Sequence, residues 1–199
     1  MYKKQMILQK TVCMMALVAA ALVFVSSLGL STDLYDAFSR TILYPDYDLE
    51  ATSVPGSRVY YDMFGFNSMF TKASIALIVI TLVLFITNTH TRRKYYISNY
   101  VSTGLMAAAS FGISFWCIPQ IMNYKSRFQN DVDFAALEQF SKDWGTLYIG
   151  PDDTFWFDIN YYVFGFLMVT ACLLIVNLLF KRKVMKAEQL AIGSGRGDR

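Results

Sequence analysis

Four long apolar runs dominate the pattern of hydrophobic and polar positions along the chain. They cover residues 12–30, 73–89, 101–121 and 159–180, and none of them contains Asp, Glu, Lys, Arg or His. About 20 apolar residues in a helix cross the roughly 30 Å of hydrocarbon in a bilayer. A soluble helix of this length would need a polar face, which these runs lack. We therefore predict an all-α integral membrane protein whose fold is a bundle of four transmembrane helices.

Two long polar segments, residues 31–72 and 122–158, connect the predicted spans, and the first of them contains a helical pattern of its own. Residues 31–33 are Ser, Thr and Asp, which are preferred N-cap residues. Apolar residues follow at helical spacing, namely Leu34, Tyr35, Phe38 and Ile42. We therefore expect a short amphipathic helix that ends near Pro45.

The second polar segment repeats this pattern and ends on a glycine. Gly145 is placed to cap the C-terminus of a helix, and the apolar positions before it are Phe134, Leu137, Phe140 and Trp144. Two short amphipathic helices can bury their apolar faces against each other, so we predict that the two segments form a small, mainly helical cap. The sequence also allows a short strand pairing between residues 58–61 and 146–149.

The positions of Lys and Arg predict the orientation. Twelve of the 18 basic residues lie near the N-terminus, between the second and third runs, and in the tail 181–199, together with only two of the 15 acidic residues. Short loops rich in Lys and Arg stay in the cytoplasm. We therefore expect both termini in the cytoplasm and the two long segments outside, in a plasma membrane or a bacterial inner membrane. The first run is longer than the apolar part of a signal peptide, so we expect an uncleaved anchor and one membrane domain over residues 1–199.

Small residues in the third run predict a close helix contact. Gly104, Ala108 and Gly112 are spaced four residues apart, and such spacing lets two helices approach closely in lipid. One alternative places the first run of the same chain against them, through its own small residues Ala16, Ala20 and Ser27. The other alternative places a different subunit there.

An aromatic sequence occurs twice, as YYDMFGF at residues 60–66 and as YYVFGF at residues 161–166. The first lies 32 residues before Arg92 and the second 20 residues before Lys181, so helices would place the two at different depths, which argues against a duplication. The first would lie on a loop or on an outward extension of the second helix. Aromatic rings favour membrane and protein interfaces. We predict an outer interaction surface formed by Tyr47, Tyr60, Tyr61, Phe64, Phe66, Trp144 and Trp156.

The sequence offers few groups for catalysis. Membrane enzymes and transporters usually keep ionisable residues in their spans, and none occurs in the four apolar runs. His90 is the only histidine, and Cys13, Cys117 and Cys172 all lie in the runs without a Cys-x-x-Cys motif. We therefore expect no enzyme, no catalytic residue and no cofactor.

Two acidic clusters were considered as sites for Ca²⁺, which binds six to eight oxygen ligands. Their members are Asp46, Asp48 and Glu50 in the first, and Asp152, Asp153 and Asp158 in the second. Neither matches a full calcium-binding loop, so we expect solvated acidic faces and no metal. The basic tail has the ordinary anchoring role, so we expect no nucleic acid among the partners.

These patterns favour a non-catalytic membrane subunit or scaffold. Its partners would be the lipid bilayer and other membrane protein subunits, bound through the outer loops and the small-residue helix face. The alternative is a subunit of an oligomeric channel or transporter with an uncharged polar pore, and a third reading is a lipid-modifying enzyme that uses outer carboxylates. The layout is similar to that of tetraspanning junction and channel-accessory proteins, although the loop cysteines common there are missing.

Overall fold

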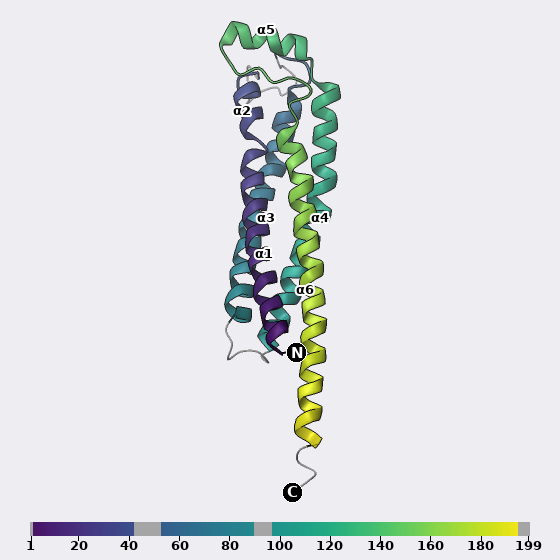
Figure 1. The fold of residues 1–199 in the computed structure, drawn as a ribbon. Coiled ribbons are helices and arrows are strands. Elements are labelled where there is room, and N and C mark those ends of the chain that lie inside the picture. Colours follow the sequence, from purple (N-terminus) through teal and green to yellow (C-terminus); the bar gives the residue numbers. More distant parts are fainter. Residues whose placement is uncertain (1, 42–52, 90–96, 195–199) are drawn as a thin grey trace. The chain divides into compact units, whose positions relative to one another are not determined.

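The computed structural model describes residues 2–41, 53–89 and 97–194, and its described residues form helices and turns without a strand (Figure 1). The all-α prediction is therefore confirmed. The helices are α1 (Tyr2–Gly29), α2 (Thr32–Phe38), α3 (Arg58–Thr89), α4 (Ile97–Asp131), α5 (Phe134–Trp144) and α6 (Phe155–Ser194).

Four of the described helices, α1, α3, α4 and α6, are long and apolar enough to cross a membrane, as the sequence predicted. They contain 28, 32, 35 and 40 residues. At about 1.5 Å per residue, such helices are about 42–60 Å long, which exceeds the hydrocarbon thickness of a bilayer. Their ends are therefore expected to extend beyond the hydrocarbon.

The chain divides into two compact units. Unit 1 contains residues 1–21, 76–112 and 165–199, and unit 2 contains residues 22–75 and 113–164. Each long helix contributes a stretch to both units, so the units are not successive along the chain. The prediction of a single membrane domain stays a prediction.

Unit 1 has apolar side chains on its surface and polar side chains in its interior. On α3, Val79 and Ile86 are exposed, whereas Thr81 and Asn88 are buried. The other long helices follow the same rule, with Val18, Val169 and Val176 exposed and Gln9, Ser110 and Asn177 buried. Water would penalise this arrangement, but a hydrocarbon solvent favours it because exposed polar groups would lose their hydrogen bonds there.

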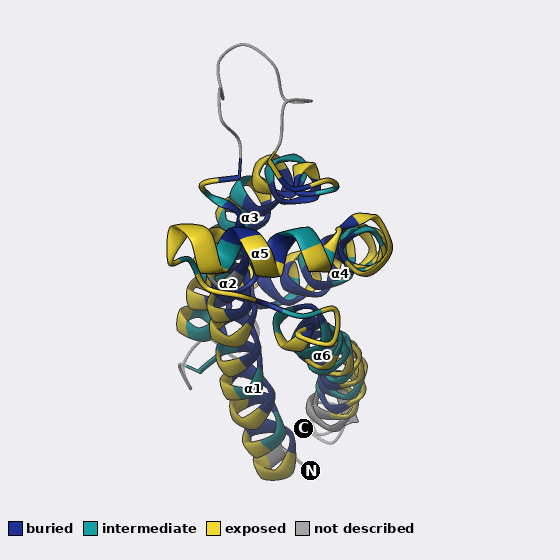
Figure 2. Cartoon of the chain, turned by 90° about the horizontal axis from the view of Figure 1, so that it is seen from above, coloured by how far each residue is buried: buried dark blue, intermediate teal, exposed yellow. Residues whose placement is uncertain are grey.

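Unit 2 is built around aromatic rings. Phe128 of α4 is fully buried, and its ring lies 5.3 Å from the ring of Phe134, 5.8 Å from that of Phe157 and 6.4 Å from that of Phe38. These rings come from α2, α4, α5 and α6, and α5 lies across the ends of the other helices of this unit (Figures 1 and 2). The aromatic core therefore fixes the short helices to the long ones.

The ends of α5 follow from its sequence. Asp133 is the N-cap residue, and its carboxylate accepts hydrogen bonds from the backbone N–H groups of Ala135 and Ala136 at 3.1 and 3.0 Å. Gly145 ends the helix with a left-handed backbone (φ 65°), as the sequence predicted. Leu137 and Phe140 form its buried face. Trp144, which the helical spacing placed on the same face, is exposed and stacks on Phe140 instead.

Two local predictions are wrong. Residues 58–61 do not pair with residues 146–149 as strands, because they form the first turn of α3 and bury Val59 and Tyr60. The first short helix, α2, ends at Phe38 rather than near Pro45, which lies outside the described residues. Ser31 is its N-cap residue but makes no capping hydrogen bond with its side chain. Of the two alternatives for residues 60–66, a loop or an extension of the second helix, the structure shows the helix, since α3 begins at Arg58.

Candidate functional site

The predicted small-residue face lies on the exposed side of α4. Gly104, Ala108 and Gly112 are all exposed, and no heavy atom of the described residues lies within 4 Å of a Cβ built on Gly104 or Gly112. The alternative in which the first run covers this face is therefore wrong. The small residues of α1 are buried elsewhere, and Ser27 lies 3.4 Å from Ser74 of α3 through their hydroxyl oxygens. An interface with another subunit stays a prediction.

The opposite side of α4 is polar and packs on α3 within unit 1. The hydroxyl of Ser102 lies 2.8 Å from that of Thr87 and accepts a hydrogen bond from Asn88 Nδ2 at 3.0 Å. One turn further along α4, Thr81 Oγ1 donates to Met106 Sδ at 3.2 Å. This side of α4 is therefore occupied within the chain, whereas the glycine side is open.

A second group of polar side chains, which we call the polar cluster, joins three helices in the interior of unit 1. It consists of Gln5 and Gln9 of α1, Asn88 of α3 and Asn177 of α6. Gln5 Nε2 donates to Gln9 Oε1 at 2.8 Å and to Asn177 Oδ1 at 3.2 Å. Gln9 Nε2 donates in turn to the backbone carbonyl of Asn88. These hydrogen bonds therefore link α1, α3 and α6 in the interior of unit 1.

Lys181 is a buried basic residue four positions after Asn177 on α6. Lys181 is only 5% exposed, whereas the neighbouring Arg182 and Lys183 are exposed. Its Nζ has no hydrogen-bond partner among the described residues. It lies 5.4 Å from the centroid of the Tyr100 ring, whose hydroxyl donates to Met185 Sδ at 2.6 Å. Where the apolar run of α6 ends, the helix therefore buries one ammonium and exposes the next two cationic groups.

Sequence reasoning missed the polar cluster, although a signal was present. The buried positions of α6 recur at spacings of three and four residues, through Asn160, Val163, Leu167, Thr170, Leu174, Asn177, Lys181 and Val184. Lys181 continues this face, so helical spacing separates it from the exposed Arg182 and Lys183. The count of basic residues that predicted the orientation treated Lys181, Arg182 and Lys183 alike.

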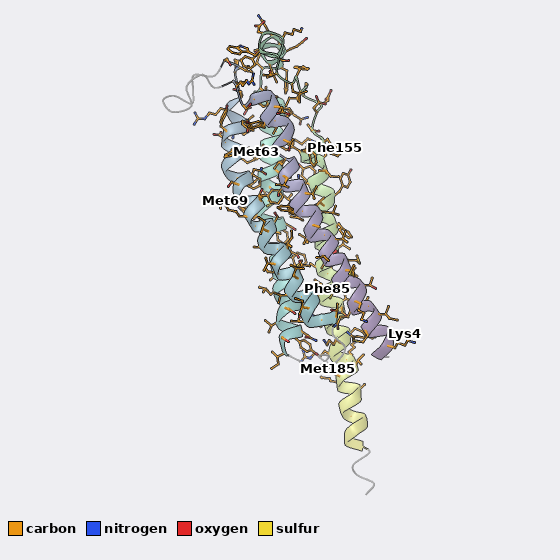
Figure 3. All side chains as sticks on the ribbon, turned by 90° about the vertical axis from the view of Figure 1, so that its left-hand side faces the viewer. Lys4, Met63, Met69, Phe85, Phe155 and Met185 are labelled. Carbon is orange, nitrogen blue, oxygen red and sulfur yellow. The ribbon has the colours of Figure 1, made fainter. Side chains whose placement is uncertain are left out.

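The predicted outer aromatic surface is only partly exposed. Tyr60 (4% exposed) and Phe66 (9% exposed) are buried, so their assignment to a surface is wrong. They belong to the inner face of α3 together with Met63, whereas Met69 of the same helix is exposed (Figure 3). Phe66 packs against the rings of Phe70, Trp116 and Tyr124. Aromatic residues at helical spacing therefore build the core of unit 2.

The other members of that predicted surface differ in exposure. Phe64 and Trp144 are 60% and 58% exposed, respectively, and remain candidates for contacts. Tyr61 is half-buried and donates to the backbone carbonyls of Phe38 and Ser39. Trp156 is also half-buried, and its ring fills the space beside Gly29, where a Cβ would overlap it. Tyr47 lies outside the described residues.

Ion pairs hold the polar parts of unit 2. Arg127 Nη2 lies 2.6 Å from Asp62 Oδ2, and Lys125 Nζ lies 2.5 Å from Asp158 Oδ1. Thr154 Oγ1 donates to the second carboxylate oxygen of Asp158 at 2.6 Å. On α5, the hydrogen bond from Lys142 to Glu138 raises the pKa of the Lys142 amine above its ordinary value.

Two members of the second acidic cluster, Asp153 and Asp158, form contacts within the chain. Asp158 is paired with Lys125, and Asp153 accepts a hydrogen bond from the backbone N–H of Gly150 at 2.7 Å within a turn. The described residues contain no group of three His, Cys, Asp or Glu side chains that could hold a metal ion. The first acidic cluster and His90 lie outside the described residues.

Unit 2 also contains a surface hollow of about 370 Å³ between α2 and the segment that follows α5. Its lining residues are Tyr35, Asp36, Ser39, Arg40, Gly145, Thr146 and Leu147. The hydroxyl of Thr146 is buried without a hydrogen-bond partner among the described residues. The lining offers one acidic and one basic group, which selects no particular charge in a ligand.

We compared the chain with protein-family models, with curated proteins and with solved structures. No match was found. Function is therefore inferred from the polarity, burial and contacts of the described residues.

Proposed function

We propose that this protein is a non-catalytic membrane subunit or scaffold that binds another membrane protein. The observation that carries the proposal is the contrast between the two sides of α4. One side is occupied by polar contacts with α3, and the other side presents Gly104, Ala108 and Gly112 with open space above them. In lipid, small residues at this spacing allow a partner helix to approach closely.

The exposed residues beside this face suit a helix contact within the hydrocarbon. Val101 and Leu105 are large, apolar and exposed on the same helix. They form ridges beside a shallow path of small residues, and van der Waals packing into such a path drives helix association in membranes. Exposed Phe64 and Trp144 would add contacts outside the hydrocarbon, where aromatic residues are enriched in interfaces.

The proposal includes an orientation and a location. Both termini would lie in the cytoplasm, and residues 31–72 and 122–158 would lie outside and form a small helical cap. The bias of Lys and Arg towards the other segments supports this orientation. The membrane would be a plasma membrane or a bacterial inner membrane.

The channel alternative receives less support. A pore that forms on oligomerisation would be lined by exposed helix faces, yet the exposed face of α3 in unit 1 carries Val79, Leu82, Val83 and Ile86. The Ser, Thr and Asn side chains that could line a pore are buried and bonded within the chain. The enzyme alternative also receives less support, because Asp158, one of its outer carboxylates, forms an ion pair with Lys125.

Replacing Gly112 by leucine is expected to leave the chain folded but to weaken partner binding about 5- to 150-fold. The isobutyl group would enter open space in the isolated chain, whereas overpacking a close helix contact costs about 1–3 kcal/mol. Gly65→Leu is the matched control, because Gly65 is also an exposed helical glycine with no described heavy atom within 4 Å of a built Cβ. Both variants would be solubilised from native membranes in mild detergent, and the stoichiometric companion would be quantified.

Three results would refute this proposal. They are a Gly112→Leu variant that retains its companion as the wild type does, a wild type without a stoichiometric companion, and a complex that contains only this chain. A ring of identical chains would favour the channel alternative. Loss of folded Gly112→Leu chain would show instead that the glycine face is covered within the chain.

A further inference from the structure

Lys181 places an ammonium in the interior of unit 1 without a counter-charge. Its Nζ is buried, and no described carboxylate lies within ion-pair distance. The Arg182 and Lys183 side chains, which follow it in the sequence, are exposed, as expected for cations. Lys181 is therefore an exception within its own helical turn.

This arrangement is costly unless another group compensates the charge. An unpaired ion in a protein interior costs several kcal/mol, even after relaxation of its surroundings. The Tyr100 ring, 5.4 Å from Nζ, offers a cation–π contact worth about 2 kcal/mol at most when desolvated. The amides of the polar cluster already bond to one another or to the backbone. A bound anion would compensate the charge of the ammonium.

The chain has little anionic charge to offer. The sequence segments of unit 1 contain twelve basic residues and two acidic ones, Glu188 and Asp198. Both follow Lys181 by seven residues or more, which is about 10 Å or more along a helix. A carboxylate of the same turn, which would be the simplest partner, does not exist in this sequence.

We propose that Lys181 is the centre of a site for a phosphate group. The ammonium has three donors without acceptors among the described residues, and the exposed Arg182 and Lys183 add positive charge to the same turn of α6. Lys181 directly follows the apolar run that ends at Phe180, which is where the hydrocarbon meets the lipid headgroups.

Two sources supply this chemistry, an anionic lipid headgroup and free phosphate. Lysine binds phosphate as a point charge, and basic residues at the end of a span attract anionic lipids. The site does not rest on the partner interface, because Gly104, Ala108 and Gly112 lie on α4 and take no part in it.

The test compares wild type, Lys181→Met and Lys183→Met in a phosphate-free detergent and buffer. Each protein receives phosphatidylglycerol, diacylglycerol with the same acyl chains, or inorganic phosphate, and the Tm is measured. Phosphatidylglycerol at about 100 times its Kd should raise the Tm of wild type and Lys183→Met by about 5–10 °C. Diacylglycerol should give no such shift, and Lys181→Met should not respond to phosphatidylglycerol. Without lipid, Lys181→Met should be at least as stable as wild type, because the unpaired charge is gone.

The source of the phosphate follows from the third addition. A higher Tm when inorganic phosphate is the only addition assigns the site to free phosphate. A higher Tm only with phosphatidylglycerol assigns it to a lipid headgroup. The proposal is overturned if Lys181→Met responds as wild type does, if diacylglycerol equals phosphatidylglycerol, or if neither phosphate source shifts the wild type. If Lys181→Met does not accumulate, phosphorus in purified wild type decides: one equivalent per chain supports the site, and none overturns it.

Discussion

Replacing Phe128 by alanine is expected to lower the free energy of unfolding by about 3–5 kcal/mol, the usual cost of truncating a buried aromatic residue. The Phe128 ring is fully buried and contacts the rings of Phe38, Phe134 and Phe157. These partners come from α2, α5 and α6, so the substitution would remove contacts that hold these three helices to α4. Thermal or denaturant unfolding in detergent would measure the loss.

Phe64→Ala is the matched control for this substitution. Phe64 is 60% exposed on α3 of the same unit, so its truncation should change the free energy of unfolding by about 0.5 kcal/mol or less. Equal stability of the two variants would show that the aromatic rings of unit 2 do not form a packed core.

Replacing Gly56 by alanine is expected to lower the free energy of unfolding by about 2–5 kcal/mol. Gly56 has a positive φ of 80°, a backbone conformation that strains other residues. A Cβ there would also overlap the backbone carbonyl oxygen of Asp131 and lie 2.8 Å from the Cα of Val132. Backbone atoms cannot move aside as a flexible side chain can, and Asp133 N–H donates to the Pro55 carbonyl at 3.0 Å in the same contact. The strain and the overlap therefore add.

Gly65→Ala provides the comparison for Gly56→Ala, since Gly65 is helical and exposed. Alanine should stabilise that helical position by about 0.5–1 kcal/mol, because glycine is the poorer helix former. Opposite signs for the two Gly→Ala substitutions in unfolding measurements are expected. An unchanged free energy of unfolding for Gly56→Ala would contradict the close contact between the turn at residues 54–57 and residues 131–133.

The sequence was sufficient to predict the four long helices and their apolar surfaces. The apolar runs without charge predicted α1, α3, α4 and α6, because length and hydropathy decide which helices can cross a bilayer. The local chemistry of Gly145 predicted the end of α5, since a positive φ at this position favours glycine. Both are properties of a short stretch of chain.

Properties that depend on which face a helix buries were harder to predict. Composition suggested that Tyr60 and Phe66 were interfacial rings, but helical spacing with Met63 and Phe70 places them in the core of unit 2. Hydropathy placed the start of the second span at Ala73, although α3 begins at Arg58. The aromatic and polar residues 58–72, about four helical turns, lower the mean hydropathy without ending the helix.

The polar residues of unit 1 show the same limit. A single Gln, Asn or Ser in or beside an apolar run does not reveal whether it faces lipid or another helix. Gln5 and Asn177 are 172 positions apart in the sequence, and only the fold brings their side chains to 3.2 Å. Spacing along α6 could have indicated the burial of Lys181, but its partners could not be derived without the tertiary arrangement.

The most direct test of membrane spanning is the protease accessibility of tags in intact cells that produce the full chain. One tag follows residue 150, and one is placed at each terminus in separate proteins. Four spans, oriented as the Lys and Arg distribution indicates, predict that external protease removes the tag at 150 and leaves both terminal tags intact until the cells are lysed. A tag at 150 that shares the accessibility of the terminal tags, either all cleaved or all protected in intact cells, would contradict the membrane-spanning bundle.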